Sequence, residues 1–110
     1  MGIRLNISKT FKCKIKYTLQ TEEGKTEDQE FLGEFKRLSQ EEVKELINSG
    51  KSDVDMVREV LVGWKATDLE THQDVPYSEE IRDALFKQTS IGAVIFLRYC
   101  EAVGAARPKA

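Results

Sequence analysis

Histidine is nearly absent from this sequence, and side chains that usually carry out catalysis are correspondingly scarce. The one histidine, His72, lies in a polar stretch between Thr71 and Gln73. No recognised motif places a serine or cysteine nucleophile beside it, as a histidine acting as a catalytic base would require. We therefore expect His72 to be a solvated loop residue rather than a catalytic base, and we expect the protein not to be an enzyme.

Cysteine is also rare, and the two that occur, Cys13 and Cys100, are far apart in the chain. Neither belongs to a C-x-x-C motif or to a cysteine and histidine spacing typical of zinc sites. A disulfide framework is not indicated, so both are expected to be buried free thiols. The glycines are isolated, and no stretch matches the G-x-x-x-x-G-K-[ST] loop that binds nucleotide phosphates. We expect no metal and no cofactor.

A strong excess of charge of one sign is lacking, because the formal net charge is -2 and acidic and basic residues are interspersed. Nucleic-acid-binding domains normally carry a basic face. No apolar run approaches the roughly 20 residues that span a bilayer, and the N-terminus lacks the apolar segment of a signal peptide. The sequence thus predicts a cytoplasmic protein that binds neither nucleic acid nor membrane.

The N-terminal part has the period of a β-strand. From Phe11 to Leu19 every second residue is apolar, and the residues between them are lysines and a threonine. This alternation predicts a strand with one buried and one solvated face. Residues 3–7 alternate in the same way and are a further strand candidate.

A hairpin follows from the next segment. Residues 22–25 predict a turn, and residues 31–36 predict a second strand with Phe31, Gly33 and Phe35 on one face. The lysines of the first strand would then lie opposite glutamates of the second, where cross-strand pairs each contribute a fraction of a kcal/mol.

The rest of the chain reads as helical. Ser39 and Glu42 form a capping box that predicts a helix start, and Gly50 offers a left-handed stop. A second helix is predicted from Asp53 to Lys65. Its apolar stripe consists of Val54, Val57, Val60, Leu61 and Trp64.

Two further helices are predicted after a polar loop that spans residues 66–76. The first begins at Ser78, with Ile81 and Leu85 facing inward, and the second spans residues 91–103 with Ser90 as its cap and Gly104 as its stop. The predicted fold is therefore α+β, with an N-terminal β-hairpin or small antiparallel sheet packed on three to four helices. We expect one domain over residues 1–104, with a β part at 1–37 and a helical part at 38–104, followed by a flexible tail at 105–110.

The helical part carries more apolar surface than one core face needs. Apolar residues cover well over half of the circumference of the last helix, so this helix is either central or in contact with another chain. We favour the second explanation, which predicts self-association or a bound partner helix. Trp64 is expected to anchor the core at the end of the second helix, or else to border a partner groove. The residues expected to contact a partner are Trp64, Tyr77, Phe86, Phe96 and Tyr99.

Several motifs occur in an order that resembles a known family. The segment from Val60 to Lys65 reads V-L-V-G-W-K, and Pro76 to Glu80 reads P-Y-S-E-E. An apolar helix with a tyrosine, Tyr99, near its end follows, and a strand-to-helix junction from Phe35 to Glu42 precedes them. This order is similar to that in the tail assembly chaperones of long-tailed bacteriophages and prophages. The loop at 66–75 departs from the family, which more often has a compact Asp-x-x-Gly turn there.

The resemblance implies a non-enzymatic chaperone in the cytoplasm of the bacterial host. Such a protein binds the tape measure protein, helps to recruit tail tube protein, commonly also has a longer frameshifted form, and is absent from the mature virion. A homo-oligomer is also expected. The alternatives are a self-associating structural tail component and a generic protein-interaction adaptor, with an enzyme as a more remote option. The predicted helical content disfavours a tube subunit, because tube proteins are dominated by β-sheet.

Overall fold

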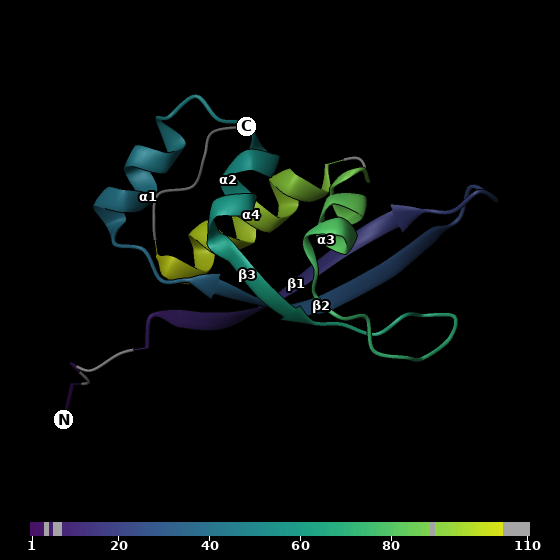
Figure 1. Cartoon of the computed structure of the whole chain (residues 1–110), viewed down its shortest axis with the longest axis horizontal. Helices are drawn as coiled ribbons and strands as arrows, with labels where there is room; N and C mark the ends of the chain where they lie inside the picture. The colour runs from purple at the N-terminus through teal and green to yellow at the C-terminus, as the bar shows by residue number, and fades with distance from the viewer. Residues whose placement is uncertain (4, 6–7, 89, 105–110) are drawn as a thin grey trace.

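The computed structural model describes residues 1–3, 5, 8–88 and 90–104, which form a three-stranded antiparallel sheet with four helices on one of its faces (Figure 1). The strand order is β1-β2-β3, so β2 is the central strand. The predicted α+β class is confirmed. The tail expected at 105–110 lies outside the described residues.

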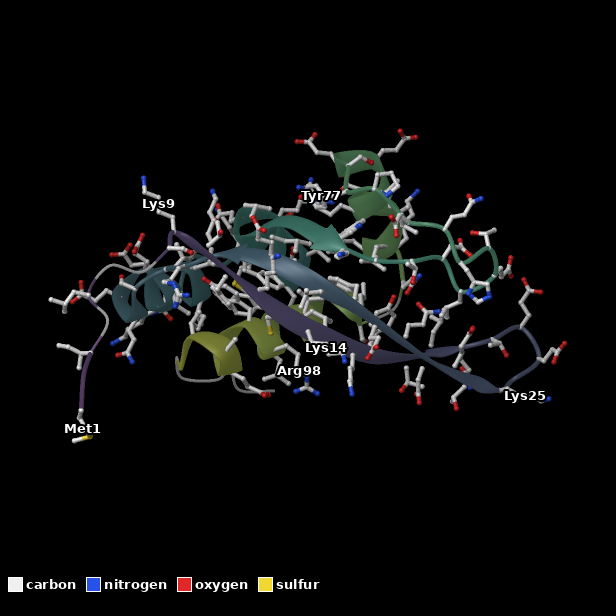
Figure 2. All side chains as sticks on the ribbon, turned by 90° about the horizontal axis from the view of Figure 1, so that it is seen from below. Met1, Lys9, Lys14, Lys25, Tyr77 and Arg98 are labelled. Carbon is white, nitrogen blue, oxygen red and sulfur yellow. The ribbon has the colours of Figure 1, made fainter. Side chains whose placement is uncertain are left out.

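The predicted hairpin is present and is longer than expected. Strand β1 spans Thr10–Gln20 and β2 spans Thr26–Lys36, paired in a register that places Ile15 opposite Phe31. The turn between them is tight because Gly24 adopts a φ of +79°, which costs glycine little. The end of the hairpin, marked by Lys25 in Figure 2, projects beyond the helices.

The two faces of the hairpin differ as the alternation predicts. Ile15, Phe31 and Phe35 are buried beneath the helices, whereas the lysines of β1 are exposed. The expected charge pairing is confirmed for Lys14, whose Nζ lies 3.5 Å from a carboxylate oxygen of Glu30. This pair is diagonal across the strands, and at such an exposed site it contributes little to stability.

The strand expected at residues 3–7 lies only partly within the described structure. Arg4, Asn6 and Ile7 are outside the described residues. Ile3 and Leu5 belong to no strand and are 86% and 85% exposed.

The first two helices begin where their caps predict. Helix α1 spans Gln40–Ile47, and the Ser39 hydroxyl accepts from the Glu42 N–H while the Glu42 carboxylate accepts from the Ser39 N–H. Helix α2 spans Asp53–Val60 and is capped by Ser52, which accepts from the Asp55 N–H. Gly50, between the two helices, has the predicted left-handed conformation, with φ of +80°.

The prediction that the second helix continues to Lys65 is wrong. It ends at Val60, and Leu61–Lys65 form strand β3, which pairs with Leu32 to Phe35 of β2. The helical spacing of the apolar residues here is misleading, because valine, glycine and tryptophan at 62–64 are poor helix formers. Two of these types, valine and tryptophan, are favoured in strands, and the edge of β2 offers backbone partners. The part of the chain expected to be helical therefore also supplies a strand.

The last two helices lie where the sequence places them. Helix α3 spans Glu79–Phe86 and is capped by Ser78, whose hydroxyl accepts from the Ile81 N–H. Helix α4 spans Ile91–Val103 and ends at Gly104, which has a φ of +72°. Ser90 is the N-cap residue of α4, as predicted, but its φ is +66° and its side chain makes no capping hydrogen bond.

Helix α4 is the centre of the fold. It packs against α2, α3 and β1, and Figure 1 shows it passing behind α2 above the sheet. Its residues Ile95, Phe96 and Tyr99 are at most 1% exposed. The apolar excess of this helix thus reflects its central position, and the explanation by contact with another chain is not needed.

The close approach of α4 to α2 depends on one glycine. A Cβ atom built on Gly92 would lie 2.8 Å from Cγ2 of Val54 and 3.2 Å from its backbone nitrogen. Any side chain at residue 92 would therefore push the two helices apart.

Candidate functional site

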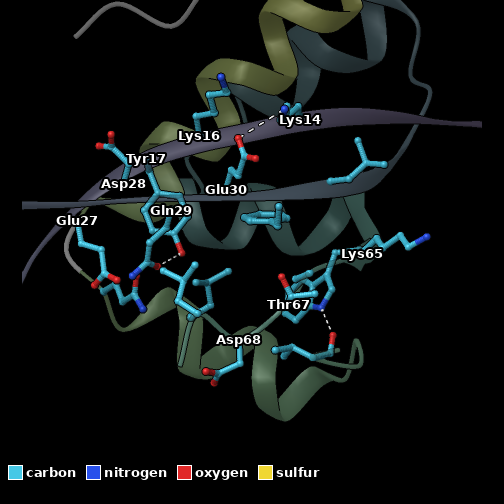
Figure 3. A pocket seen from close by; sticks show the side chains of 18 of the residues that line it. Lys14, Lys16, Tyr17, Glu27, Asp28, Gln29, Glu30, Lys65, Thr67 and Asp68 are labelled. Carbon is cyan, nitrogen blue, oxygen red and sulfur yellow. Dashed lines mark hydrogen bonds and ion pairs between the residues drawn. The ribbon is translucent and has the colours of Figure 1, made fainter. Parts of the chain in front are cut away.

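An open groove of about 1410 Å³ lies between the projecting half of the hairpin, the loop at 66–76 and helix α3 (Figure 3). Consecutive residues 27–32 of β2 line one side, and residues 64–70 line the other. Because neighbouring residues of a strand point to opposite faces, a lining of consecutive residues means that the edge of β2 borders the groove.

Aromatic rings line up beside this groove. The ring of Trp64 lies 5.8 Å from that of Phe31 and 4.9 Å from that of Tyr77, both in edge-to-face contacts. Phe31 in turn contacts Tyr17, with ring centroids 6.4 Å apart. We call these four residues, Tyr17, Phe31, Trp64 and Tyr77, the aromatic row. Together with Ile81 and Leu85 of α3, the first three give the groove an apolar floor.

Hydrogen bonds fix the orientation of the aromatic row. The indole N–H of Trp64 donates to the Val75 carbonyl at 2.9 Å, and the Tyr77 hydroxyl donates to the Leu61 carbonyl at 3.1 Å. These two bonds tie the C-terminal end of the 66–76 loop to β3. The Tyr17 hydroxyl donates to Oε1 of Gln29 at 2.7 Å, and partial burial raises the pKa of Tyr17.

The loop at 66–76 is ordered by Asp68. Its Oδ1 accepts from the backbone N–H groups of Glu70 at 2.8 Å and Thr71 at 3.1 Å. The bonds from Thr71 and Glu70 lower the pKa of the Asp68 carboxyl. An isolated bridge between Thr67 and Asp74 closes the loop. His72, exposed as predicted, takes the left-handed position of the loop, with a φ of +59°.

The edge of β2 that faces the groove has free backbone groups. At the two ends of the hairpin, the Arg37 N–H donates to the Lys9 carbonyl and the Thr21 N–H donates to the Lys25 carbonyl. Bonded and non-bonded pairs alternate in an antiparallel ladder, so the odd-numbered residues of β2 bond to β1. Its even-numbered residues direct their N–H and C=O groups to the other side. In the described part of the chain, β3 pairs there only from Leu32 onward, which leaves Thr26, Asp28 and Glu30 without a strand partner.

The groove is predominantly acidic. Six carboxylates line it, against three lysines. The acidic residues are Glu27, Asp28, Glu30, Asp68, Glu70 and Asp74, and the lysines are Lys14, Lys16 and Lys65. Gln88, also in the lining, has a buried Oε1 that accepts no hydrogen bond from any described residue. An occupant with hydrogen-bond donors and positive charge would complement this lining.

The residues expected to contact a partner separate into two groups. Trp64 lines the groove, from a strand rather than from the end of a helix. Tyr77 packs against the ring of Trp64. Phe86, Phe96 and Tyr99 are core residues, 9%, 1% and 0% exposed. A partner could reach these three side chains only if the domain opened.

Sequence reasoning missed the contribution of β2 to this site. Residues 26–30 read T-E-D-Q-E, and without an apolar residue they give no strand period. The available signal was the length of the first strand, because an apolar alternation that continues to Leu19 requires a partner strand beginning near residue 26.

Metal-ligating clusters, paired cysteines and membrane-spanning helices are all absent from the described part of the chain. Among the described residues, no cluster of three or more histidine, cysteine, aspartate or glutamate side chains could hold a metal ion. Both cysteines are free, Cys100 in the core and Cys13 half-buried. No helix in the described part of the chain is long and apolar enough to cross a membrane.

Comparison with known proteins adds no assignment. No protein-family model, no curated protein and no solved structure matches this chain.

Proposed function

We propose that this protein is a non-enzymatic tail assembly chaperone that binds a tape measure protein and helps to recruit tail tube subunits in the host cytoplasm. The proposal starts from the resemblance of residues 34–103 to that family. One observation supports it: motif residues far apart in the sequence contact each other beside the groove. Trp64 of the V-L-V-G-W-K segment packs on Tyr77 of the P-Y-S-E-E segment, whose hydroxyl bonds back to Leu61.

The groove suits a polypeptide better than a small molecule. It is open, with an apolar floor and a strand edge, whereas small-molecule sites are enclosed and bury most of the ligand. A tape measure protein exposes long apolar stripes until the tail tube surrounds it. Covering such stripes requires a surface of this kind, with apolar side chains bordered by polar ones.

The alternative of a self-associating tail component loses its main support. That reading drew on the apolar excess of the last helix, which is accounted for by the central position of α4. The sheet of three strands beside four helices also differs from the β-dominated architecture of tube subunits. A generic adaptor would use the same groove and differs only in its partner.

The direct test is co-expression with the long, helical protein encoded beside this chain in its genome. We expect that protein to become soluble and to co-purify only when this chain is present. Leu69, which is 50% exposed and lines the groove, supplies a variant, since Leu69→Asp should weaken co-purification about tenfold without unfolding the domain. Val62→Asp is the matched control, because Val62 is exposed but does not line the groove. A client that stays insoluble with the wild-type chain would overturn the proposal.

A further inference from the structure

We propose that the groove binds an extended segment of the partner by strand addition to the free edge of β2, and that this segment alternates basic and apolar residues. The inference deepens the proposed function, on which it rests for the idea that the occupant is a polypeptide. It specifies which backbone groups make the contact and which side chains are selected.

The backbone evidence is the interrupted pairing of β2. Strand β2 has 11 residues, but β3 has 5 and covers only the second half of the edge. Asp28 and Glu30 present their N–H and C=O groups to the groove, and Thr26 continues the same edge, all with no strand partner among the described residues. An added strand would continue the line of β3 and satisfy these groups, as in other cases of β-augmentation.

The side chains of an added strand would meet two different surfaces. Residues opposite Gln29 and Phe31 would point to the helix-covered face, onto Trp64 and the other groove residues of the aromatic row. Residues opposite Asp28 and Glu30 would point to the other face, beside carboxylates. An apolar side chain suits the first position and a lysine or arginine suits the second, which produces a period of two.

The opposite edge of the sheet has the reverse charge. By the same alternation, the outward backbone groups of β1 belong to even-numbered residues, among them Lys12, Lys14 and Lys16. These lysines repel a basic strand and protect the edge from pairing. A basic segment is therefore directed to β2 and away from β1.

Binding of a synthetic probe tests the inference directly. The probe is an alternating Lys-Val heptapeptide, and its binding is followed by the fluorescence of Trp64, the single tryptophan of the chain. We expect saturable binding, and we expect an alternating Glu-Val heptapeptide to bind about tenfold more weakly or less. A peptide with the same lysines and valines in two blocks should also bind more weakly, because it cannot place them on separate faces. Equal binding of all three peptides would overturn the inference.

A pair of proline variants separates the two edges. Asp28→Pro removes one outward N–H of β2 without disturbing the ladder to β1, since proline is tolerated where the N–H is not needed for pairing. Thr18→Pro is the matched control, because Thr18 lies directly opposite Asp28 and also lines the groove, but its N–H points to the other edge. Each variant also disturbs the same Thr18 to Asp28 side-chain hydrogen bond. We expect Asp28→Pro to weaken probe binding about tenfold and Thr18→Pro to leave it unchanged.

Amide hydrogen exchange provides a readout that does not depend on any variant. Strand addition should slow exchange at Asp28 and Glu30, whereas Gln29 is protected by β1 with or without the probe. Unchanged exchange at Asp28 and Glu30 in the saturated complex would overturn the inference. If the free protein instead forms a dimer that Asp28→Pro abolishes, the occupant of the edge is a second copy of the chain and the inference is also wrong.

These outcomes are distinguishable from failure of the proposed function. Probe binding with slowed exchange, combined with a client that stays insoluble, would leave strand addition standing and remove the chaperone assignment. A client solubilised equally by the wild type and Asp28→Pro, with no probe binding, would remove strand addition and leave the chaperone assignment.

Discussion

The hydroxyl of Tyr99 in α4 donates a hydrogen bond of 2.8 Å to the backbone carbonyl of Lys36, the last residue of β2. The ring of Tyr99 also lies 5.5 Å from that of Phe35 and is fully buried. One side chain therefore ties the central helix to the point where the central strand ends and the chain turns toward α1.

Tyr99→Phe should lower the free energy of unfolding by about 1 to 2 kcal/mol, because it keeps the ring and leaves the Lys36 carbonyl without this partner. Tyr17→Phe is the matched control. It loses a bond to the half-buried side chain of Gln29, which water can replace, so its loss should be smaller. Urea unfolding of both variants measures the two losses in free energy of unfolding, and equal losses would contradict the prediction.

The serine residues at the helix starts are expected to differ in their contribution to stability. Ser39→Ala, Ser52→Ala and Ser78→Ala each remove a side-chain cap and should each cost about 1 kcal/mol. Ser90→Ala should cost less, since the Ser90 side chain makes no capping bond. Thermal unfolding of the four variants is the measurement, and a Ser90→Ala loss as large as the others would contradict the geometry at the start of α4.

Glycine substitutions should separate a tight contact from an open one. Gly92→Ala places a Cβ against Val54 and should cost about 1 to 3 kcal/mol. Gly63→Ala is the control, because the nearest atom to its Cβ, in Glu34, is 3.9 Å away. If the two variants unfold at the same urea concentration, α2 and α4 do not approach as closely as described.

The loop at 66–76 offers a stabilising change. His72 has a left-handed φ of +59°, which is unfavourable for a residue with a Cβ. His72→Gly should therefore raise the free energy of unfolding by up to about 1 kcal/mol, whereas His72→Ala should give no gain. Both are read from urea unfolding curves, and a gain for alanine as large as that for glycine would exclude backbone strain as the cause.

Stability should fall at alkaline pH. Burial raises the pKa of the Cys100 thiol from 9.0 to about 11, so this thiol keeps its proton in the folded chain at pH values where it ionises in the unfolded chain. Its contribution is full below about pH 9 and is lost as pH rises toward 11, with a total of about 2 to 3 kcal/mol. Cys100→Ala should unfold with a shallower pH dependence than the wild type in reducing buffer. If the free energies of unfolding of the variant and the wild type change in parallel from pH 8 to 11, the prediction is wrong.

Much of the fold could be predicted from local patterns. The alternation from Phe11 to Leu19 and the capping box at Ser39 act through neighbouring residues, so the sequence alone fixes them. The strand conformation of Leu61 to Trp64 could not be predicted in the same way. Their apolar spacing fits a helix, and only the open edge of β2, about thirty residues earlier, makes the strand the better partner.

The candidate site was predictable only through two of its residues. Trp64 and Tyr77 belong to motifs, but the edge at Thr26 to Glu30 has no apolar residue to mark it. Its accessibility arises from a difference in length between β2 and β3, which depends on where the chain leaves the sheet after Lys65. This difference in length is set by tertiary structure, and no local periodicity of the sequence predicts it.

The central position of α4 determines when this domain can fold during synthesis. The β1–β2 hairpin closes through a short turn and can form early, but the helix that fills the middle of the core follows all the other described strands and helices in the chain. Until residues 91–103 are available, β1 lacks the helix that packs on it. A nascent chain therefore lacks its finished core until α4 has left the ribosome, and truncations before Ile91 should yield polypeptides that proteases degrade.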